Sequence, residues 1–187
     1  MQNLIASLKK SLGGKVGKLI HILGGGLLIV TLLGLSLMMK NHRDYQANIL
    51  PAVLVEMTNE NRLANHLNEL KVSPVLEQAA KLKAEDMAKN SYFAHTSPDG
   101  KTPWFWFQEA GYAYLYAGEN LAVNFNDNAA VTQAWLNSVR HRENILSKNY
   151  SEIGIATAEG NYKGNKSTFI VVMLGVPLPS MKTIGLK

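Results

Sequence analysis

An uncharged apolar run from Leu19 to Met39 limits what this chain can fold into more than any other feature. The run contains no Asp, Glu, Lys or Arg, and a helix of about 20 residues spans the hydrocarbon core of a bilayer, which is about 30 Å thick. A cleaved signal peptide has a shorter apolar region of about 7–15 residues and a cleavage site flanked by small residues, which residues 34–39 do not offer. We therefore predict that residues 19–39 form an uncleaved transmembrane helix.

Basic residues gather in front of the apolar run. Residues 1–18 contain four lysines and no acidic residue, whereas only Lys40 and Arg43 follow the run closely. By the positive-inside rule, the more basic flank stays in the cytoplasm. Residues 1–18 are therefore predicted to be a basic cytoplasmic segment. The chain is predicted to cross the cell membrane once and to place its C-terminal part outside the cytoplasm.

The net charge of +5 belongs to the same flank. Beyond residue 40, fourteen basic residues face fourteen acidic ones, so the C-terminal part is formally neutral and gives no support to a nucleic-acid partner. The chain has no cysteine, which excludes thiolate metal ligands and cysteine nucleophiles. A domain outside the cytoplasm without disulfides must be held together by its hydrophobic core.

The remaining chain divides into a polar stalk over residues 40–50, one domain over residues 51–176 and a loose tail over residues 177–187. Proline and short polar residues before apolar stripes predict helices, and short β-branched runs predict strands. The predicted helices begin at Pro51, run from Pro74 to about Asn90 and from Trp104 to Ala110, and run from Asp127 to near Val139. The predicted strands are Ile153–Thr157 and Thr168–Met173, joined by a polar loop at 159–167, with Ala117–Val123 as a connector or short strand. This order predicts an α+β domain built in layers.

Three short polar clusters could carry chemistry. They begin at His95, at Gly118 and at His141, and they place His95, Glu119 and His141 at separations of 24 and 22 residues. These side chains cannot share one helix face, so they meet only if the fold brings loops and element ends together. Two imidazoles and a carboxylate suit a divalent metal such as zinc, or a metal-free acid–base cleft. A purely structural role in loops and helix ends is a third alternative.

Five short motifs in this order resemble the SCP-like branch of the CAP superfamily, the cysteine-rich secretory and pathogenesis-related family, in its bacterial, disulfide-free form. The resemblance runs from about Val53 to Gly175. It implies an α-β-α sandwich with a central antiparallel sheet and an open cleft, in which two His and two Glu form a tetrad that can bind zinc or another divalent ion. The motifs are Tyr92–Pro98, Ala117–Asn120, Ala134–Ser138, His141–Leu146 and Ile153–Ile155.

The resemblance assigns tetrad roles to three residues only. His95 matches the first histidine, Glu119 the first glutamate and His141 the second histidine. Val139 stands where the second glutamate is usual, and Arg140 stands where glycine is common. A valine cannot balance the charge of a metal or act as a base, and an arginine facing the cleft would oppose a bound cation.

Three polar neighbours of the tetrad positions, Ser97, Asn120 and Asn144, are expected to line the cleft. One or two of the aromatic residues in Trp104–Phe107 are expected to face a surface or groove, since all four cannot point inward from one helix.

These observations predict a single-pass, membrane-anchored binding module outside the cytoplasm. The resemblance makes a lipid, a sterol-like molecule, a cell-wall glycan or a protein the possible ligand. The alternative is a metal-assisted hydrolase of peptidase type, in which Glu119 acts as the base on a metal-bound water held by His95 and His141. His95, His141 and Glu119 are the predicted metal ligands, with Glu119 or water completing the set that the two histidines begin.

Overall fold

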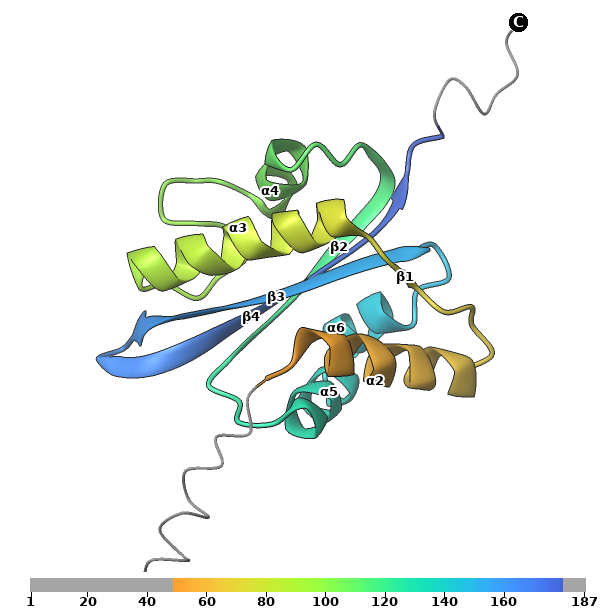
Figure 1. The fold of residues 1–187 in the computed structure, drawn as a ribbon, viewed down its shortest axis with the longest axis horizontal. Coiled ribbons are helices and arrows are strands. Elements are labelled where there is room, and N and C mark those ends of the chain that lie inside the picture. The colour runs from red at the N-terminus through yellow and green to blue at the C-terminus, as the bar shows by residue number, and fades with distance from the viewer. Residues whose placement is uncertain (1–48, 180–187) are drawn as a thin grey trace, which may run out of the picture. The chain divides into compact units, whose positions relative to one another are not determined.

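The computed structural model describes residues 49–179 of the chain. The basic segment 1–18, the predicted transmembrane helix 19–39, most of the stalk and the tail from residue 180 lie outside the described residues. Within residues 49–179, no helix combines the length and the apolar character needed to cross a bilayer. This part of the chain forms an α+β sandwich in which helices cover both faces of a four-stranded sheet (Figure 1).

Strand β4 (Asn165–Pro177) organises the sheet because it is buried on both faces. The strand order is β1-β3-β4-β2, and β4 pairs antiparallel with both β3 (Glu152–Tyr162) and β2 (Tyr114–Val123). A continuous apolar run is what a strand with helices on both faces requires. Successive residues of this run alternate between two cores: Phe169, Val171 and Met173 face one, and Ile170, Val172 and Leu174 face the other.

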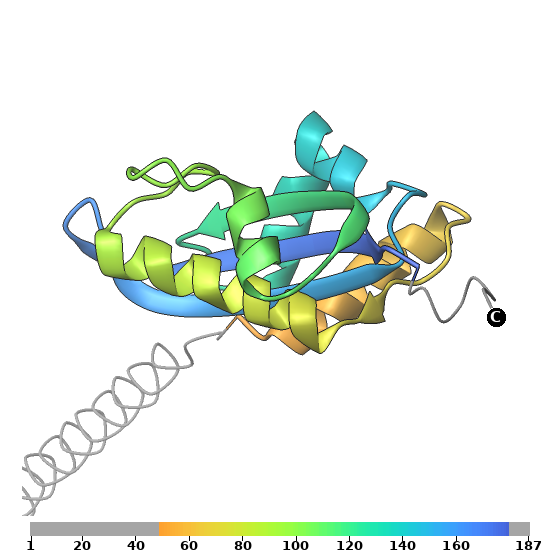
Figure 2. The same ribbon diagram turned by 90° about the horizontal axis from the view of Figure 1, so that it is seen from above.

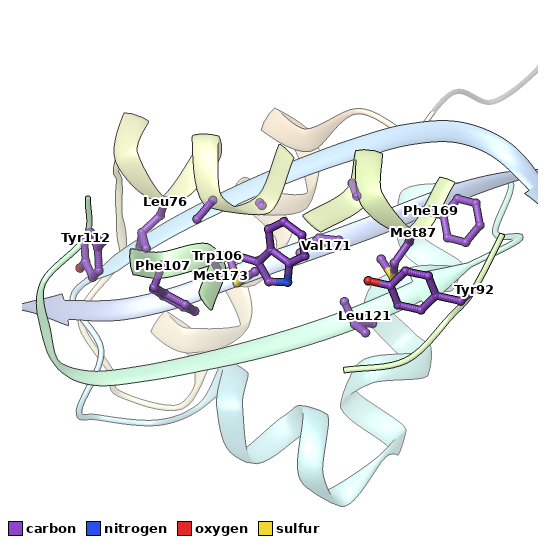
Figure 3. Close-up of a cluster of buried hydrophobic side chains, with 13 residues drawn as sticks. Leu76, Met87, Tyr92, Trp106, Phe107, Tyr112, Leu121, Phe169, Val171 and Met173 are labelled. Carbon is purple, nitrogen blue, oxygen red and sulfur yellow. The ribbon is translucent and has the colours of Figure 1, made fainter. Parts of the chain in front are cut away.

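The first core lies between the sheet and the helices α3 (Pro74–Asn90) and α4 (Pro103–Glu109) (Figure 3). Small residues let α3 approach β3 closely, since Ala79, Ala80 and Ala84 of the helix are fully buried. A Cβ atom added at Gly154 of β3 would lie 2.1 Å from the backbone carbon of Leu76. The backbone of α3 therefore packs directly against the backbone of β3. This packing fixes the position of the C-terminal end of α3 and of the loop that follows it.

The second core covers the opposite face, beneath α2 (Pro51–Ala64), α5 (Asn128–Asn137) and α6 (Val139–Ile145). Asp127 caps α5 by accepting a hydrogen bond from the backbone of Ala130, as its position before the helix predicted. Trp135 of α5 and Ile145 of α6 are buried against the sheet. Figure 2 shows the same layers from above.

The central antiparallel sheet that the resemblance implies is formed by β2, β4 and β3, but a parallel pair extends it at one edge. Strand β1 (Lys71–Val72) pairs parallel with β3, through Lys71 with Glu152 and Val72 with Ile153, so the sheet is mixed. The sequence predicted no strand at residues 71–72. Two residues carry no detectable strand periodicity, and the pairing depends on where β3 lies in the fold.

The polar loop expected at residues 159–167 is also wrong, because β3 and β4 continue through it as a regular hairpin. The turn is limited to Lys163 and Gly164, both with positive φ (51° and 81°), as a type I′ turn requires. This part of the hairpin is largely exposed. Its polar residues therefore resembled a loop although the strand pairing is maintained.

The helix expected from Asp127 to near Val139 is in fact two helices. Ser138 has extended backbone (φ −89°, ψ 122°) and separates α5 from α6. His141 therefore lies in the first turn of a separate short helix and does not cap a helix end. In α2, the buried positions are Leu54, Thr58 and Arg62.

Candidate functional site

A pocket of about 480 Å³ opens between α4, β2, α6 and the loop that follows α3. Its lining joins residues from all three polar clusters of the sequence, which the fold brings together from segments far apart in the chain. One wall is apolar, formed by Pro103 and Trp104, and the other is polar. The lining residues are His95, Pro103, Trp104, Ala117, Gly118, Glu119, Ser138, Arg140, His141 and Asn144.

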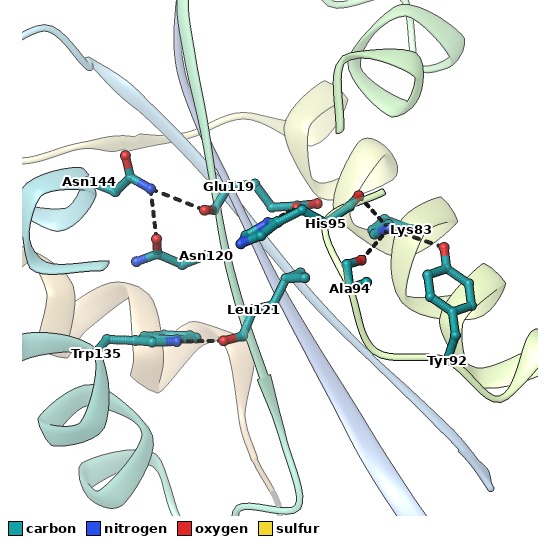
Figure 4. Close-up of polar contacts among 9 residues, drawn as sticks. All are labelled: Lys83, Tyr92, Ala94, His95, Glu119, Asn120, Leu121, Trp135 and Asn144. Carbon is teal, nitrogen blue, oxygen red and sulfur yellow. Dashed lines mark hydrogen bonds and ion pairs between the residues drawn. The ribbon is translucent and has the colours of Figure 1, made fainter. Parts of the chain in front are cut away.

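His95 and Glu119 form the shortest polar contact of the pocket. The Nδ1 atom of His95 lies 2.6 Å from Oε1 of Glu119 (Figure 4). The carboxylate is buried, with 2% of the side chain exposed, whereas the imidazole is 56% exposed. With the carboxylate ionised, Nδ1 carries a hydrogen and donates the hydrogen bond to Oε1, which fixes the orientation of the ring. Glu119 thus orients His95.

Glu119 is buried more deeply than an ionised carboxylate prefers. Burial raises the pKa of Glu119 above its ordinary value of 4.5, while the hydrogen bond from His95 and the positive charge of Lys83 oppose this rise. Its second oxygen, Oε2, is buried and has no hydrogen-bond partner within residues 49–179. Most buried polar atoms are paired, so this oxygen retains capacity for one further donor.

His141 forms the opposite side of the pocket. Burial lowers the pKa of His141 below its ordinary value of 6.5, and the nearby His95 lowers this pKa further. The uncharged imidazole of His141 is therefore favoured in the folded protein.

Lys83 of α3 lies behind the contact between His95 and Glu119, fully buried. Its ammonium group donates to the hydroxyl of Tyr92 at 3.1 Å and to the backbone carbonyls of Ala94 and His95, both at 2.9 Å (Figure 4). All three donors of the lysine are thus in use. Burial lowers the pKa of Lys83, and neighbouring carboxylates, Glu119 first among them, oppose this change. Lys83 holds the segment that ends at His95 against α3.

Asn120 and Asn144 join α6 to β2. Asn120 is fully buried and donates from Nδ2 to the carbonyl of His141 at 3.0 Å. Asn144 donates to Oδ1 of Asn120 at 2.8 Å and to the carbonyl of Glu119 at 3.1 Å. The two asparagines therefore fix the spacing between the strand that carries Glu119 and the helix that carries His141.

Arg62 of α2 holds the other end of α6. Its guanidinium group is buried and donates to the carbonyls of Asn68 at 2.9 Å and of Ile145 and Ser147, both at 2.8 Å, with a longer contact of 3.4 Å to the carbonyl of Tyr150. A cation at the C-terminal end of a helix is favourable because the last carbonyls lack partners. Arg62 thereby positions α6 and the residues that follow it.

The outer edge of β2 is closed by side chains rather than by another strand. Three alternate carbonyls of this edge strand accept hydrogen bonds at 3.0–3.2 Å. The donors are Tyr150 to Ala117, Asn144 to Glu119 and Trp135 to Leu121.

Close packing of side chains explains why β2 contains a glycine at position 118, beside the pocket. A Cβ atom at this position would lie 2.5 Å from the hydroxyl oxygen of Tyr150 and 3.1 Å from Oδ1 of Asn144. Both distances are shorter than ordinary van der Waals contact. The glycine therefore permits the approach of Tyr150 and Asn144 to β2.

Of the three other residues predicted to line the cleft, one does so and two lie elsewhere. Asn144 lines the pocket, whereas Ser97 and Asn120 are buried and do not belong to its lining. The hydroxyl of Ser97 bonds to the carboxylate of Asp99 and accepts from the backbone of Lys101 at 2.9 Å, so it shapes the loop after His95. Val139 is exposed at the start of α6.

The metal that the resemblance implies needs a donor set that the described residues do not supply. Catalytic zinc sites use three protein ligands. Within residues 49–179, no three side chains of His, Cys, Asp or Glu are grouped closely enough to hold a metal ion. Glu119 directs one oxygen to His95, Val139 offers no donor and Arg140 adds a cation to the lining. These residues do not fit a three-ligand centre, and only the imidazoles of His95 and His141 remain as candidate ligands.

Comparison with known proteins identifies relatives among bacteria. The chain is 37% identical over 106 residues to the uncharacterized protein YkwD of Bacillus subtilis, a match that covers 57% of this chain and 41% of YkwD. It is 30% identical over 112 residues to the uncharacterized membrane protein YlbC of the same organism, which covers 60% of this chain and 32% of YlbC. The chain therefore spans less than half the length of these relatives.

A solved structure and a family model agree with these relatives. An extracellular protein containing an SCP domain from Bacillus anthracis is 29% identical and superposes with a TM-score of 0.57, over 66% of this chain and 39% of that protein. The model of the cysteine-rich secretory protein family, CAP, matches residues 55–174, which include every residue that lines the pocket. This chain belongs to the cysteine-rich secretory protein (CAP) family.

Proposed function

We propose that this protein is a binding module displayed outside the cytoplasm and held at the cell membrane by the predicted helix at residues 19–39. The observation that supports this most is the pocket of about 480 Å³ with one apolar and one polar wall. That volume and that mixture are typical of sites for small molecules or for a group that projects from a larger one. The occupant would be part of a lipid, a cell-wall glycan or a protein.

The descriptions of one relative and of one structural neighbour support a location at the membrane and outside the cytoplasm. One relative is a membrane protein and one structural neighbour is an extracellular protein. Because the chain has no cysteine, single cysteines can report topology in intact cells with a membrane-impermeant maleimide. We expect Lys148→Cys, in an exposed loop, to be labelled in intact cells and Asn3→Cys to be labelled only after lysis. Labelling of Asn3→Cys alone in intact cells would contradict the proposed orientation.

Occupancy of the pocket can be read from Trp104. The chain has three tryptophans; Trp104 lines the pocket and is 45% exposed, whereas Trp106 and Trp135 are buried. The full chain would be labelled with 5-fluorotryptophan, solubilised in a neutral detergent and titrated with an N-acetylated amino sugar, glycerol phosphate and a dipeptide. We expect at least one probe to shift the fluorine signal of Trp104 saturably and to leave that of Trp135 in place. If no probe moves the Trp104 signal, the proposed binding function fails.

The alternative function, metal-assisted hydrolysis with Glu119 as the base, has one observation in its favour. Glu119 orients His95 and keeps its Oε2 atom without a partner among the described residues. Zinc titration calorimetry on the full chain, beside the His95→Ala and His141→Ala double variant, tests it. We expect weak binding, completed by water, that the double variant loses. Tight binding of one zinc per chain, together with peptidase activity that Glu119→Gln abolishes, would establish the hydrolase instead.

A further inference from the structure

The charged groups that line the pocket differ in how accessible they are. Arg140 is exposed and carries a positive charge, and the imidazoles of His141 and His95 line the pocket with it. Glu119 is the carboxylate in the lining, and one of its oxygens already accepts from His95 while the other is buried. The pocket therefore presents an exposed guanidinium group, whereas the carboxylate oxygens of Glu119 are paired or buried.

Arg140 has no acidic partner in the part of the chain that the structure describes. The ion pairs found between residues 49 and 179 involve Lys81, His95, Lys101 and Lys166, and none involves Arg140. Its side chain is exposed, and no hydrogen bond within the described residues holds it. The planar guanidinium group matches carboxylate and phosphate oxygens with two parallel hydrogen bonds. Arg140 is thus available to an anion that enters from outside.

The apolar wall of the pocket, formed by Pro103 and Trp104, offers a surface for an apolar group attached to this anion. The indole of Trp104 is 45% exposed although it packs against Phe107 and Tyr114, with ring centroids 6.0 Å apart in both pairs. Pro103 extends the same wall. An exposed but rigidly packed indole offers a flat surface for an apolar group.

We propose that the pocket binds an oxyanion, a phosphate or a carboxylate, that carries an apolar substituent. Arg140 pairs with the oxyanion, His141 donates or accepts beside it, and the substituent lies against Trp104. This inference rests on the proposed binding function and specifies its ligand class. The residue at position 140 is where the family resemblance leads one to expect glycine, so the preference for an anion is a property of this chain.

The test compares probes that differ in charge, with the fluorine signal of Trp104 in the full chain as the readout. The probes are phenyl phosphate, phenylacetate, benzyl alcohol as the uncharged analogue, and benzylammonium as the cation. Inorganic phosphate and glycerol phosphate form two further arms, which separate free phosphate from a lipid headgroup. The key variant is Arg140→Met. Its matched control is Lys148→Met, which removes one positive charge from an exposed position outside the pocket.

We expect phenyl phosphate to bind at least 10-fold more tightly than benzyl alcohol and inorganic phosphate, because it engages both walls. Arg140→Met should weaken phenyl phosphate binding at least 10-fold and leave benzyl alcohol within twofold, whereas Lys148→Met should change neither by more than twofold. Equal affinity for the charged and uncharged probes, or an unchanged affinity in Arg140→Met, would overturn the anion preference while the binding function stands. Absence of binding by every probe would remove both.

Discussion

Two buried cations, Lys83 and Arg62, hold the two sides of the pocket, and they do so in the same way. Each is fully buried, and each donates to backbone carbonyls rather than to a carboxylate. Lys83 fixes the segment that ends at His95, and Arg62 fixes the end of the helix that carries His141. Both residues therefore position a histidine through the backbone.

The difference lies in what surrounds each cation. Lys83 lies close enough to Glu119 for its charge to lower the pKa of that carboxyl, whereas the pKa of Arg62 is lowered by burial with no carboxylate opposing the change. Lys83 can thus influence both the geometry and the protonation of the site. Arg62 influences geometry alone. Similar hydrogen-bond patterns thus have different functional consequences at these two residues.

Arg62→Met should produce the largest effect. The substitution keeps an apolar stem but leaves several buried carbonyls without their donor, and we expect the free energy of unfolding to fall by about 3–5 kcal/mol. Chemical denaturation of the full chain measures this loss. Arg142→Met is the matched control, because Arg142 is exposed and donates to one carbonyl, that of Leu136; it should cost less than about 1 kcal/mol. A loss in Arg62→Met no greater than in the control would contradict the anchoring role.

Lys83→Met should cost about 2–4 kcal/mol, since three acceptors lose one donor group. Unlike Arg62→Met, it should also raise the pKa of Glu119, because the positive charge that opposes the effect of burial is removed. Carbon-detected NMR of the Glu119 carboxyl over a pH series reports this change. Lys81→Met serves as the control, because Lys81 is exposed and pairs with Glu85 one turn along the same helix. An unaltered Glu119 titration in Lys83→Met would reduce Lys83 to a purely mechanical role.

Gly118→Ala tests the packing of α6 and Tyr150 against the strand that carries Glu119. The added methyl group would press against Tyr150 and Asn144, and we expect a loss of about 1–3 kcal/mol as these side chains shift. The Trp104 fluorine signal should report weaker probe binding, because Asn144 lines the pocket. Gly164→Ala is a control outside the site, at a turn glycine with open space around it; it should lower stability through its positive φ but leave probe binding unchanged.

The smallest effect is a pH dependence that originates at His141. Burial lowers the folded-state pKa of His141 below its ordinary value of 6.5, so the unfolded chain binds more protons between these two values. The free energy of unfolding should therefore fall as pH falls through about 6.5. His141→Gln should remove this part of the dependence in denaturation curves measured between pH 5 and about 8. A curve that is equally steep in His141→Gln would assign the dependence to other groups.

The sequence predicted correctly which polar clusters lie together. It predicted less well how the helices and strands bring these clusters together. His95, Glu119 and His141 line one pocket, and the order of helices and strands follows the expected layers. Apolar spacing and residue type carry that information locally. The break at Ser138 is not visible in such spacing, because α5 and α6 are separated by a single extended residue.

The buried cations lay beyond sequence reasoning for a related reason. Lys83 lies on the apolar stripe of its helix with Ala80 and Met87, and a long side chain on such a stripe commonly reaches solvent with its charged end. Here its partners are backbone carbonyls eleven and twelve residues away. The partners of Arg62 include carbonyls 83 and 85 residues away. Carbonyl groups occur at every residue, so no pattern in the sequence marks the ones that become acceptors.

The closed edge of β2 has a consequence for assembly. An exposed edge strand can pair with the strand of another molecule, which leads to aggregation or to capture of an extended peptide. Here Tyr150, Asn144 and Trp135 already occupy the carbonyls that such a strand would need. Asn144, which lines the pocket, thus also helps to protect the sheet from pairing with another strand, and its loss would free the carbonyl of Glu119 at this edge.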